Sequence, residues 1–168
     1  MKIYIIGIVA SGKTTLARKW SKVLNIPFYE LDCIVYGEKA GVRYKRTPEE
    51  QLEIIRQIDK KGKWIIEGTY RKNAHILLDL ADRIVFLDTP IWKRNVRILS
   101  RHIKQVWGLE KCHYKPSLYM LKSMYSWSND FEKNRDRFEA MLKKYGHKLV
   151  IIHTPTKVEE ISHSRKVS

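Results

Sequence analysis

Residues 7–14 read Gly-Ile-Val-Ala-Ser-Gly-Lys-Thr, and this stretch decides the fold. It matches the pattern Gly-x-x-x-x-Gly-Lys-(Ser/Thr). An apolar segment comes before it, and a segment of helical character, Thr15 to Leu24, follows it. In that setting the successive N–H groups of the loop and the start of the helix can bind one anion together. The stretch therefore predicts a phosphate-binding loop between a first strand and a first helix.

The residues of this loop have distinct chemical uses in binding ATP and Mg²⁺, the cofactors that the motif predicts. Lys13 adds a point charge for the β- and γ-phosphates, and the Thr14 hydroxyl is a ligand for Mg²⁺. The other predicted nucleotide-binding residues act from the loop and the helix start: Gly7, Ala10, Ser11, Gly12 and Thr15. Ala10 stands where many such loops have glycine, so a positive φ at this position would be strained.

Apolar segments of strand length alternate with longer segments of helical periodicity along the whole chain. The candidate strands are Lys2–Ile6, Pro27–Leu31, Lys63–Ile66, Arg83–Leu87 and Lys148–Ile152. They are apolar on both faces, as is typical of strands that helices cover on both sides. The pattern predicts one α/β domain over residues 1–168, with three α/β/α layers around a five-stranded parallel sheet.

Capping residues predict where several helices begin. Three segments combine a capping side chain with a glutamate three residues later: Thr47 with Glu50, Asn129 with Glu132, and Thr156 with Glu159. Thr89 and Pro90 open another helix. Residues 108–128 contain an internal proline, several aromatic residues and a lone acid, Glu110, and we expect them to form a mobile insertion.

Charge and composition narrow the class of partner. The chain has 33 Lys and Arg against 18 Asp and Glu, a net charge of +15, which indicates an anionic partner. The longest apolar run is far shorter than the roughly 20 residues that cross a bilayer. Cys33 and Cys112 form no disulfide framework. We expect a cytoplasmic protein with no membrane segment, and the sequence leaves its oligomeric state open.

The helix after Pro90 separates two kinds of residue. Five apolar residues recur at intervals of 4, 3, 4 and 3 and form one stripe: Trp92, Val96, Leu99, Ile103 and Val106. Four basic residues lie on a different face: Arg94, Arg97, Arg101 and Lys104. Because no acid occurs from Thr89 to Leu109 to offset these like charges, we expect a polyphosphate to neutralise the basic face.

Two further residues are candidates because of their position. Asp32 follows the second strand, where open α/β sheets place ligand-contacting side chains, and it could accept the proton of a substrate hydroxyl. The alternative is a carboxylate that only caps the strand end. Arg135 falls on the apolar face of its predicted helix. Because a buried unpaired arginine is prohibitive, we expect it to reach the cleft and stabilise the transferring phosphoryl group.

The chain resembles P-loop kinases of the adenylate-kinase type, and more narrowly the DNA topology modulation (FlaR-related) proteins. The resemblance rests on the phosphate loop, Leu31 and Asp32, Trp64–Tyr70, Ala81–Asp88, the later arginines and Trp127. It implies a strand order of 2-3-1-4-5 and a lid.

The resemblance also implies roles for individual residues. Glu67 would hold Mg²⁺ through water, and Arg71 would face an anionic group of the acceptor. Arg97 and Arg101 would contact the nucleotide. In this chain Glu67 stands for the Asp of adenylate kinases, and Tyr70 stands for their Pro.

These observations predict an ATP-dependent phosphotransferase that moves the γ-phosphoryl group to a nucleoside, a nucleotide or another hydroxyl metabolite. The alternative is a nucleic-acid-binding protein that affects DNA topology, or a polynucleotide 5′-hydroxyl kinase. Residues 91–126 favour the alternative because they carry eight Lys or Arg against one acid. No recognisable nucleic-acid-binding motif supports it. We expect any nucleic-acid binding to be weak and independent of sequence.

Overall fold

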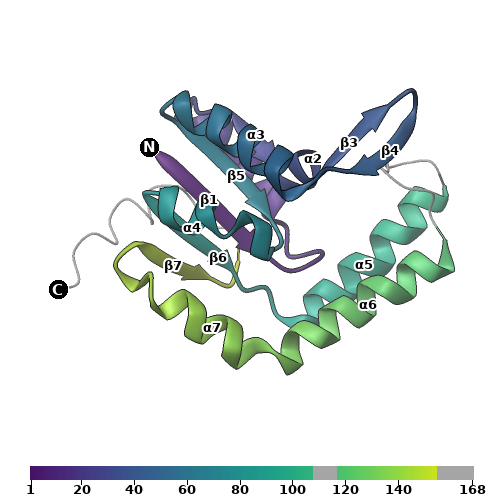
Figure 1. Ribbon diagram of the computed structural model, residues 1–168. Helices are drawn as coiled ribbons and strands as arrows, with labels where there is room; N and C mark the ends of the chain where they lie inside the picture. Colours follow the sequence, from purple (N-terminus) through teal and green to yellow (C-terminus); the bar gives the residue numbers. More distant parts are fainter. Residues whose placement is uncertain (108–116, 155–168) are drawn as a thin grey trace.

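The computed structural model describes residues 1–107 and 117–154 of the chain (Figure 1). The strands are β1 (Lys2–Gly7), β2 (Phe28–Glu30), β3 (Tyr36–Lys39), β4 (Val42–Lys45), β5 (Trp64–Gly68), β6 (Arg83–Leu87) and β7 (Leu149–Ile152). The helices are α1 (Lys13–Leu24), α2 (Leu31–Val35), α3 (Pro48–Lys60), α4 (Ile76–Leu80), α5 (Ile91–Val106), α6 (Leu118–Lys133) and α7 (Arg135–Lys143). Two 3₁₀ turns cover Lys72–Ala74 and Gly146–Lys148.

Five parallel strands form the central sheet in the order β2-β5-β1-β6-β7. Counted among these five strands alone, the order is 2-3-1-4-5, as the family resemblance implies. In this register Ile5 of β1 lies between Glu67 of β5 and Val85 of β6. The predicted fold class and all five candidate strands are confirmed.

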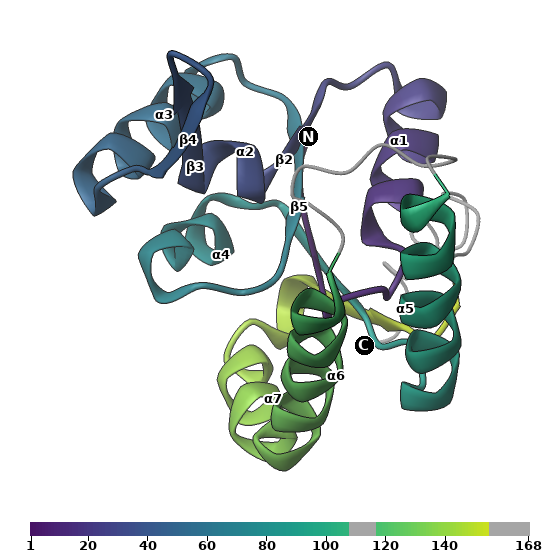
Figure 2. The same ribbon diagram turned by 90° about the vertical axis from the view of Figure 1, so that its right-hand side faces the viewer.

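Alternate residues of β1 enter two different apolar cores, one on each face of the sheet. Tyr4 and Ile6 belong to a core that α2, α3, α4 and α7 complete. Ile3 and Ile5 pack on the other face against α1, whose Trp20 is almost fully buried. Figure 2 shows α1 and α4 on opposite sides of the sheet. This arrangement places the carboxyl ends of β1, β2 and β5 at one edge.

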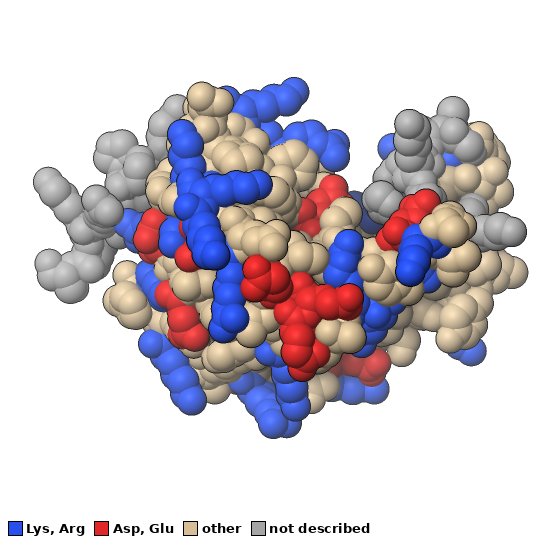
Figure 3. Space-filling model, turned by 45° about the horizontal axis from the view of Figure 1, so that its top comes forward, with Lys and Arg blue, Asp and Glu red and all other residues tan. Residues whose placement is uncertain are grey.

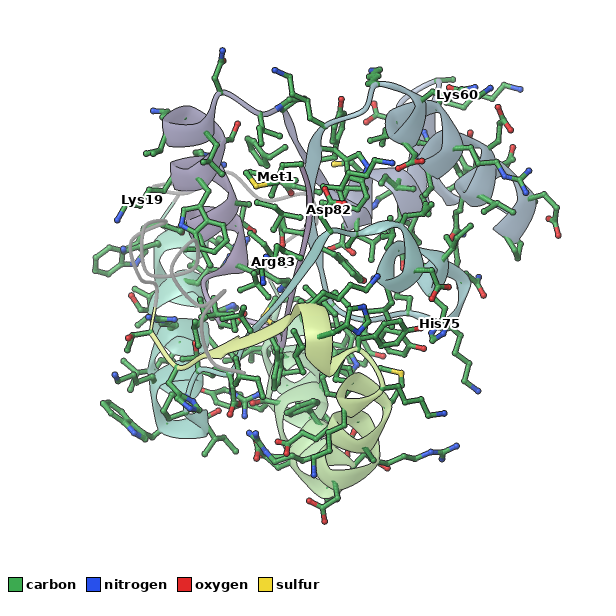
Figure 4. All side chains as sticks on the ribbon, turned by 90° about the vertical axis from the view of Figure 1, so that its left-hand side faces the viewer. Met1, Lys19, Lys60, His75, Asp82 and Arg83 are labelled. Atoms are coloured by element: carbon green, nitrogen blue, oxygen red, sulfur yellow. The ribbon has the colours of Figure 1, made fainter. Side chains whose placement is uncertain are left out.

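Polar contacts join the start of β1 to the residue before β6, and others fix the start of α3. The backbone N–H of Lys2 donates to Asp82 (2.7 Å), and the N-terminal amine of Met1 lies 3.8 Å from the same carboxylate, as the side chains in Figure 4 illustrate. Thr47 and Glu50 form the reciprocal capping box that the sequence predicts. Their side chains satisfy N–H groups that the first helical turn leaves without partners.

The expected helix start at Asn129 is wrong, because Asn129 lies inside the continuous helix α6. The helix starts at Ser117, whose hydroxyl accepts a hydrogen bond from the N–H of Met120. The Glu132 carboxylate cannot cap at Asn129, since Arg94 and Arg135 bind it. Residues 118–128 are therefore helical, while 108–116 of the expected insertion and the Thr156 start lie outside the described residues.

An antiparallel hairpin of β3 and β4 follows α2, and the sequence analysis missed it. Ala40 and Gly41 at its tip have φ values of 51° and 76°, the two positive angles of a type I′ turn. Gly37 lets the Tyr44 ring lie against the backbone, because a Cβ there would lie 2.8 Å from the ring and displace it. β4 is exposed along its length, so no alternation of apolar and polar residues marks it. None of the helices in residues 1–107 and 117–154 is long and apolar enough to cross a membrane.

The phosphate loop contains a non-glycine residue in the left-handed region, since Ala10 has φ 58°. The strain expected from the sequence is therefore present. We expect Ala10→Gly to raise the free energy of unfolding by about 0.5–1 kcal/mol, because glycine removes a strain of about 1–2 kcal/mol and loses more chain entropy on folding. Urea denaturation measures this change.

Ala17→Gly in the interior of α1 is the matched control and should instead lower the free energy of unfolding by about 1 kcal/mol. A loss of stability in Ala10→Gly would show that Ala10 is not strained.

Candidate active site

The phosphate loop joins β1 to α1 and is closed by its own backbone. The N–H of Ser11 donates to the carbonyl of Ile8 (3.1 Å), and Gly12 at the N-terminus of α1 has φ 98°. Gly7 is obligatory, because a Cβ at that position would lie 2.4 Å from the Ser11 hydroxyl oxygen. The Lys13 ammonium donates to the Ile8 carbonyl (3.2 Å). The predicted loop residues are thus brought together in the geometry that the motif requires.

Nearby carboxylates, Glu67, Asp32 and Glu30, offset the burial of Lys13. Burial lowers the pKa of Lys13, while the nearby charges of Glu67 and Asp32 raise it. Arg101 is close enough to lower it further. Side chains from β5, α2 and α5 therefore meet around one lysine, although their positions in the sequence are far apart.

Glu67 at the end of β5 joins the loop through the hydroxyl of Thr14, which donates to one carboxylate oxygen (2.7 Å). Only 3% of Glu67 is exposed, and burial raises its pKa against the opposing effect of Lys13. Its second oxygen, Oε2, has no hydrogen-bond partner within residues 1–107 and 117–154. A buried carboxylate oxygen without a partner, next to a threonine hydroxyl, is a donor set that suits Mg²⁺.

Asp32 and Arg71 lie at the neighbouring strand ends and form an ion pair of 2.8 Å. Asp32 belongs to the first turn of α2, directly after β2, and its side chain is exposed. Arg71 also lies near the Tyr36 ring (5.9 Å), and Arg43 of the hairpin packs on that ring at 4.2 Å. The sequence analysis found Asp32 and Arg71 but not the part that the hairpin contributes.

The basic face of α5 turns toward the phosphate loop. Arg97 donates to the carbonyls of Ser11 (2.6 Å) and Ala10 (3.3 Å). The Thr89 hydroxyl donates to the same Ser11 carbonyl (2.8 Å) instead of capping α5. Arg97 and Arg101 therefore lie beside the loop, and their contact with a nucleotide stays a prediction.

The rest of α5 shows an inverted pattern. Arg94 is only 1% exposed and pairs with Glu132 of α6. The apolar stripe from Trp92 to Val106 is exposed instead, contrary to the usual amphipathic arrangement. The three arginines thus lie on the inner face of this helix, while Lys104 of the predicted basic face is exposed.

Arg135 lies among carboxylates rather than free in a cleft. Its guanidinium donates to both oxygens of Asp88 (2.9 and 3.0 Å) and also to Glu132 and Glu139. The hydrogen bonds that Arg135 donates to Asp88 contribute most to raising the pKa of Arg135. These acids, and not an open cleft, compensate the burial of Arg135 and fix the start of α7 to the end of β6. Its action on the transferring phosphoryl group stays a prediction.

No protein-family model matches the chain. It is 34% identical over 104 residues to the shikimate kinase of Aquifex aeolicus (strain VF5), covering 54% of this chain and 61% of that protein. It is 35% identical over 49 residues to the shikimate kinase of Chlamydia pneumoniae, covering 29% and 28% of the two chains. The chain thus spans less than two thirds of the length of the curated relatives it matches.

Solved structures share the fold over nearly the whole chain. The shikimate kinase of Acinetobacter baumannii, in complex with shikimate, has a TM-score of 0.64 at 15% identity, covering 99% of this chain and 95% of that one. An uncharacterized protein from Eubacterium ventriosum has a TM-score of 0.57 at 16% identity, covering 100% and 99%.

These likenesses show the fold and leave the narrower resemblance to the DNA topology modulation proteins unconfirmed. The chain has the shikimate-kinase-like P-loop kinase fold.

Proposed function

We propose that the protein transfers the γ-phosphoryl group of Mg·ATP to a hydroxyl group of a small acceptor that carries an anionic group. One observation carries the proposal. The phosphate loop with Thr14 and Glu67, and the Asp32–Arg71 ion pair, lie side by side at the carboxyl ends of β1, β5 and β2. Open α/β sheets bind their ligands at this edge.

On the nucleotide side, the loop N–H groups and Lys13 bind and orient the phosphates. Arg97 and Arg101 neutralise charge on the transferring group, since both lie beside the loop. Thr14 and Glu67 would hold Mg²⁺, which supplies charge neutralisation on the phosphate oxygens when it is bound.

On the acceptor side, Asp32 accepts the proton of the attacking hydroxyl and Arg71 holds the carboxylate in place. The ion pair orients Asp32 before the acceptor arrives, because two charge-assisted groups fix one another's geometry. The remaining donors of the Arg71 guanidinium face an anionic group of the acceptor. Arg43 and Tyr36 of the hairpin border the same position.

A hydroxylated carboxylic acid of the shikimate type fits this site. The curated relatives are shikimate kinases, and one solved neighbour holds shikimate. A nucleoside or nucleotide acceptor remains a second candidate, because Arg71 recognises phosphate as well as carboxylate.

The geometry of α5 argues against nucleic acid as the acceptor. Arg94 is buried and Arg97 is bound to the loop, so neither forms an exposed track for a phosphate backbone. On the face drawn in Figure 3, basic side chains are interspersed with acidic ones. Arg97 and Arg101 therefore serve the phosphate loop, and Arg94 pairs with α6.

Loss of the loop lysine tests nucleotide binding. Mg·ATP at about 100 times its Kd should raise the melting temperature of the wild type, since that occupancy adds roughly 2.7 kcal/mol to stability. Lys13→Ala should lose most of the shift while keeping its fold, as measured by differential scanning fluorimetry and circular dichroism.

Lys19→Ala is the matched control, because Lys19 projects outward from α1 (Figure 4). An undiminished melting-temperature shift in Lys13→Ala would show that the phosphates bind elsewhere.

The proton acceptor is tested with Asp32→Asn. This variant should keep its ATP affinity and lose about 10²–10⁴ in turnover, the usual contribution of a positioned acid or base. Turnover is measured as ADP release with hydroxy acids, nucleosides and nucleotides as acceptors. Asp136→Asn, on α7, is the control. Full activity in Asp32→Asn would show that Asp32 only stabilises the start of α2. Loss of ATP binding would show instead that Asp32 is a metal ligand.

Steady-state kinetics and melting temperatures distinguish the roles of the arginines. Arg97→Ala and Arg101→Ala should lower kcat more than they raise KM, because they act on charge that develops in the transition state. Arg135→Ala should also lower the melting temperature, since it leaves Asp88 without its partner. Arg137→Ala, whose side chain lies outside this network, is the control. Small and equal effects at all four positions would remove the arginines from the mechanism.

A further inference from the structure

The outer face of α5 exposes large apolar side chains that have no role in the proposed function. Six large apolar side chains on it are between 43% and 72% exposed: Trp92, Val96, Leu99, Ile103, Val106 and Trp107. Together they expose on the order of 600 Å², which is the upper end for the largest apolar patch on a typical monomer. A solvent-facing surface of this size indicates an interaction face.

The inner face of the same helix is already occupied. The Tyr125 hydroxyl of α6 donates to the carbonyl of Asn95 (3.1 Å), Arg94 pairs with Glu132 of α6, and Arg97 binds the phosphate loop. Figure 2 shows α6 alongside one side of α5, which itself lies at the edge of the molecule. The apolar face is therefore turned away from α6 and from the active site.

The spacing of the exposed residues is that of a helix that packs against another helix. Trp92, Val96, Leu99, Ile103 and Val106, here called the α5 seam, recur at intervals of 4, 3, 4 and 3. This is the a/d spacing of a heptad repeat over two heptads, with Val96 and Ile103 at the a positions and Leu99 at a central d position. A stripe of this spacing packs against a second helix.

The charges on the exposed face permit a second copy of the chain as the partner. The net charge of +15 would ordinarily oppose self-association. On α5, however, Lys104 is the only charged residue among the exposed positions from Ile91 to Val106, while the arginines point inward. This face offers few basic groups to an acidic partner. A nearly uncharged apolar face can instead pack against the same face of a second copy of the chain.

We propose that the α5 seam is a homodimer interface, in which the α5 helices of two copies pack against one another about a two-fold axis near Leu99. Such an interface is isologous, so Leu99 lies close to its own copy. Burying the seam and Trp107 of both copies removes about 1,200 Å² of surface, the lower limit of stable interfaces. The dimer should therefore have a dissociation constant in the micromolar range, about 1–100 µM.

Sedimentation velocity of the full chain over about 1–200 µM tests the proposal. The wild type should show concentration-dependent dimerisation. Leu99→Glu should raise the dissociation constant at least about tenfold, because it places two carboxylates at the centre of the seam. Val96→Glu is a second variant of the same face. Val23→Glu is the matched control, because Val23 is a single exposed valine on α1 and 63% exposed.

Circular dichroism and the Mg·ATP melting shift are measured on each variant, so that loss of the dimer is distinguished from loss of folding or of the nucleotide site. A dimer that weakens in both seam variants, with the fold and the melting shift kept, supports the proposal. A wild type that stays monomeric to about 200 µM overturns it, as does a dimer that both seam variants leave unchanged. Unfolding of both variants would also overturn it, because the face would then be covered within one copy.

Discussion

The hydrogen bonds from Arg97 to the carbonyls of Ala10 and Ser11 set the orientation of α5. A loop that turns its N–H groups toward an anion turns carbonyl groups the other way, and these need donors when they are shielded from water. Arg97 supplies donors for two of them. Because Arg94 and Arg101 lie on the same helix face, fixing Arg97 inward carries the other two inward as well. The apolar stripe of α5 is consequently turned to solvent.

Inward arginines must be paired, and their partners connect the helices after β6. Glu132 of α6 binds both Arg94 and Arg135, and Arg135 also holds Asp88 at the end of β6. A buried ion pair is weak evidence of net stability, but it strongly favours one arrangement, since any other leaves a charge without its partner. The network therefore determines how α5, α6 and α7 are placed around the phosphate loop.

Similar carboxylates acquire different properties at the edge of the sheet. Glu67 is nearly fully buried beside Thr14 and Lys13, and burial raises its pKa. Asp32 lies in the first turn of α2, exposed and held by Arg71. The buried position of Glu67 suits the binding of a metal ion among phosphates. The exposed position of Asp32 suits contact with an acceptor that enters from solvent. Both residues lie at the carboxyl ends of apolar strands, so the local sequence does not distinguish them. The difference comes from what surrounds the ends of β5 and β2.

The sequence by itself determined the sheet, the phosphate loop and the strong capping box at Thr47. These features depend on signals within a few residues: apolar runs of strand length, glycines at fixed positions, and a cap with its glutamate. It also placed Asp32, Glu67 and Arg71 at strand ends, because parallel strands present their carboxyl ends at one edge. It misplaced a helix start at Asn129, where the local capping pattern was the same but Glu132 had stronger partners elsewhere.

The tertiary structure alone decided which way α5 faces, what Arg135 binds and where the β3–β4 hairpin stands. Arg97 and Ser11 are 86 residues apart, and Arg135 and Asp88 are 47 apart. A periodic pattern divides a helix into two faces, but it does not say which face meets the rest of the protein. That choice depends on the free energy of pairing distant charges and carbonyl groups, which exists only once the chain has folded.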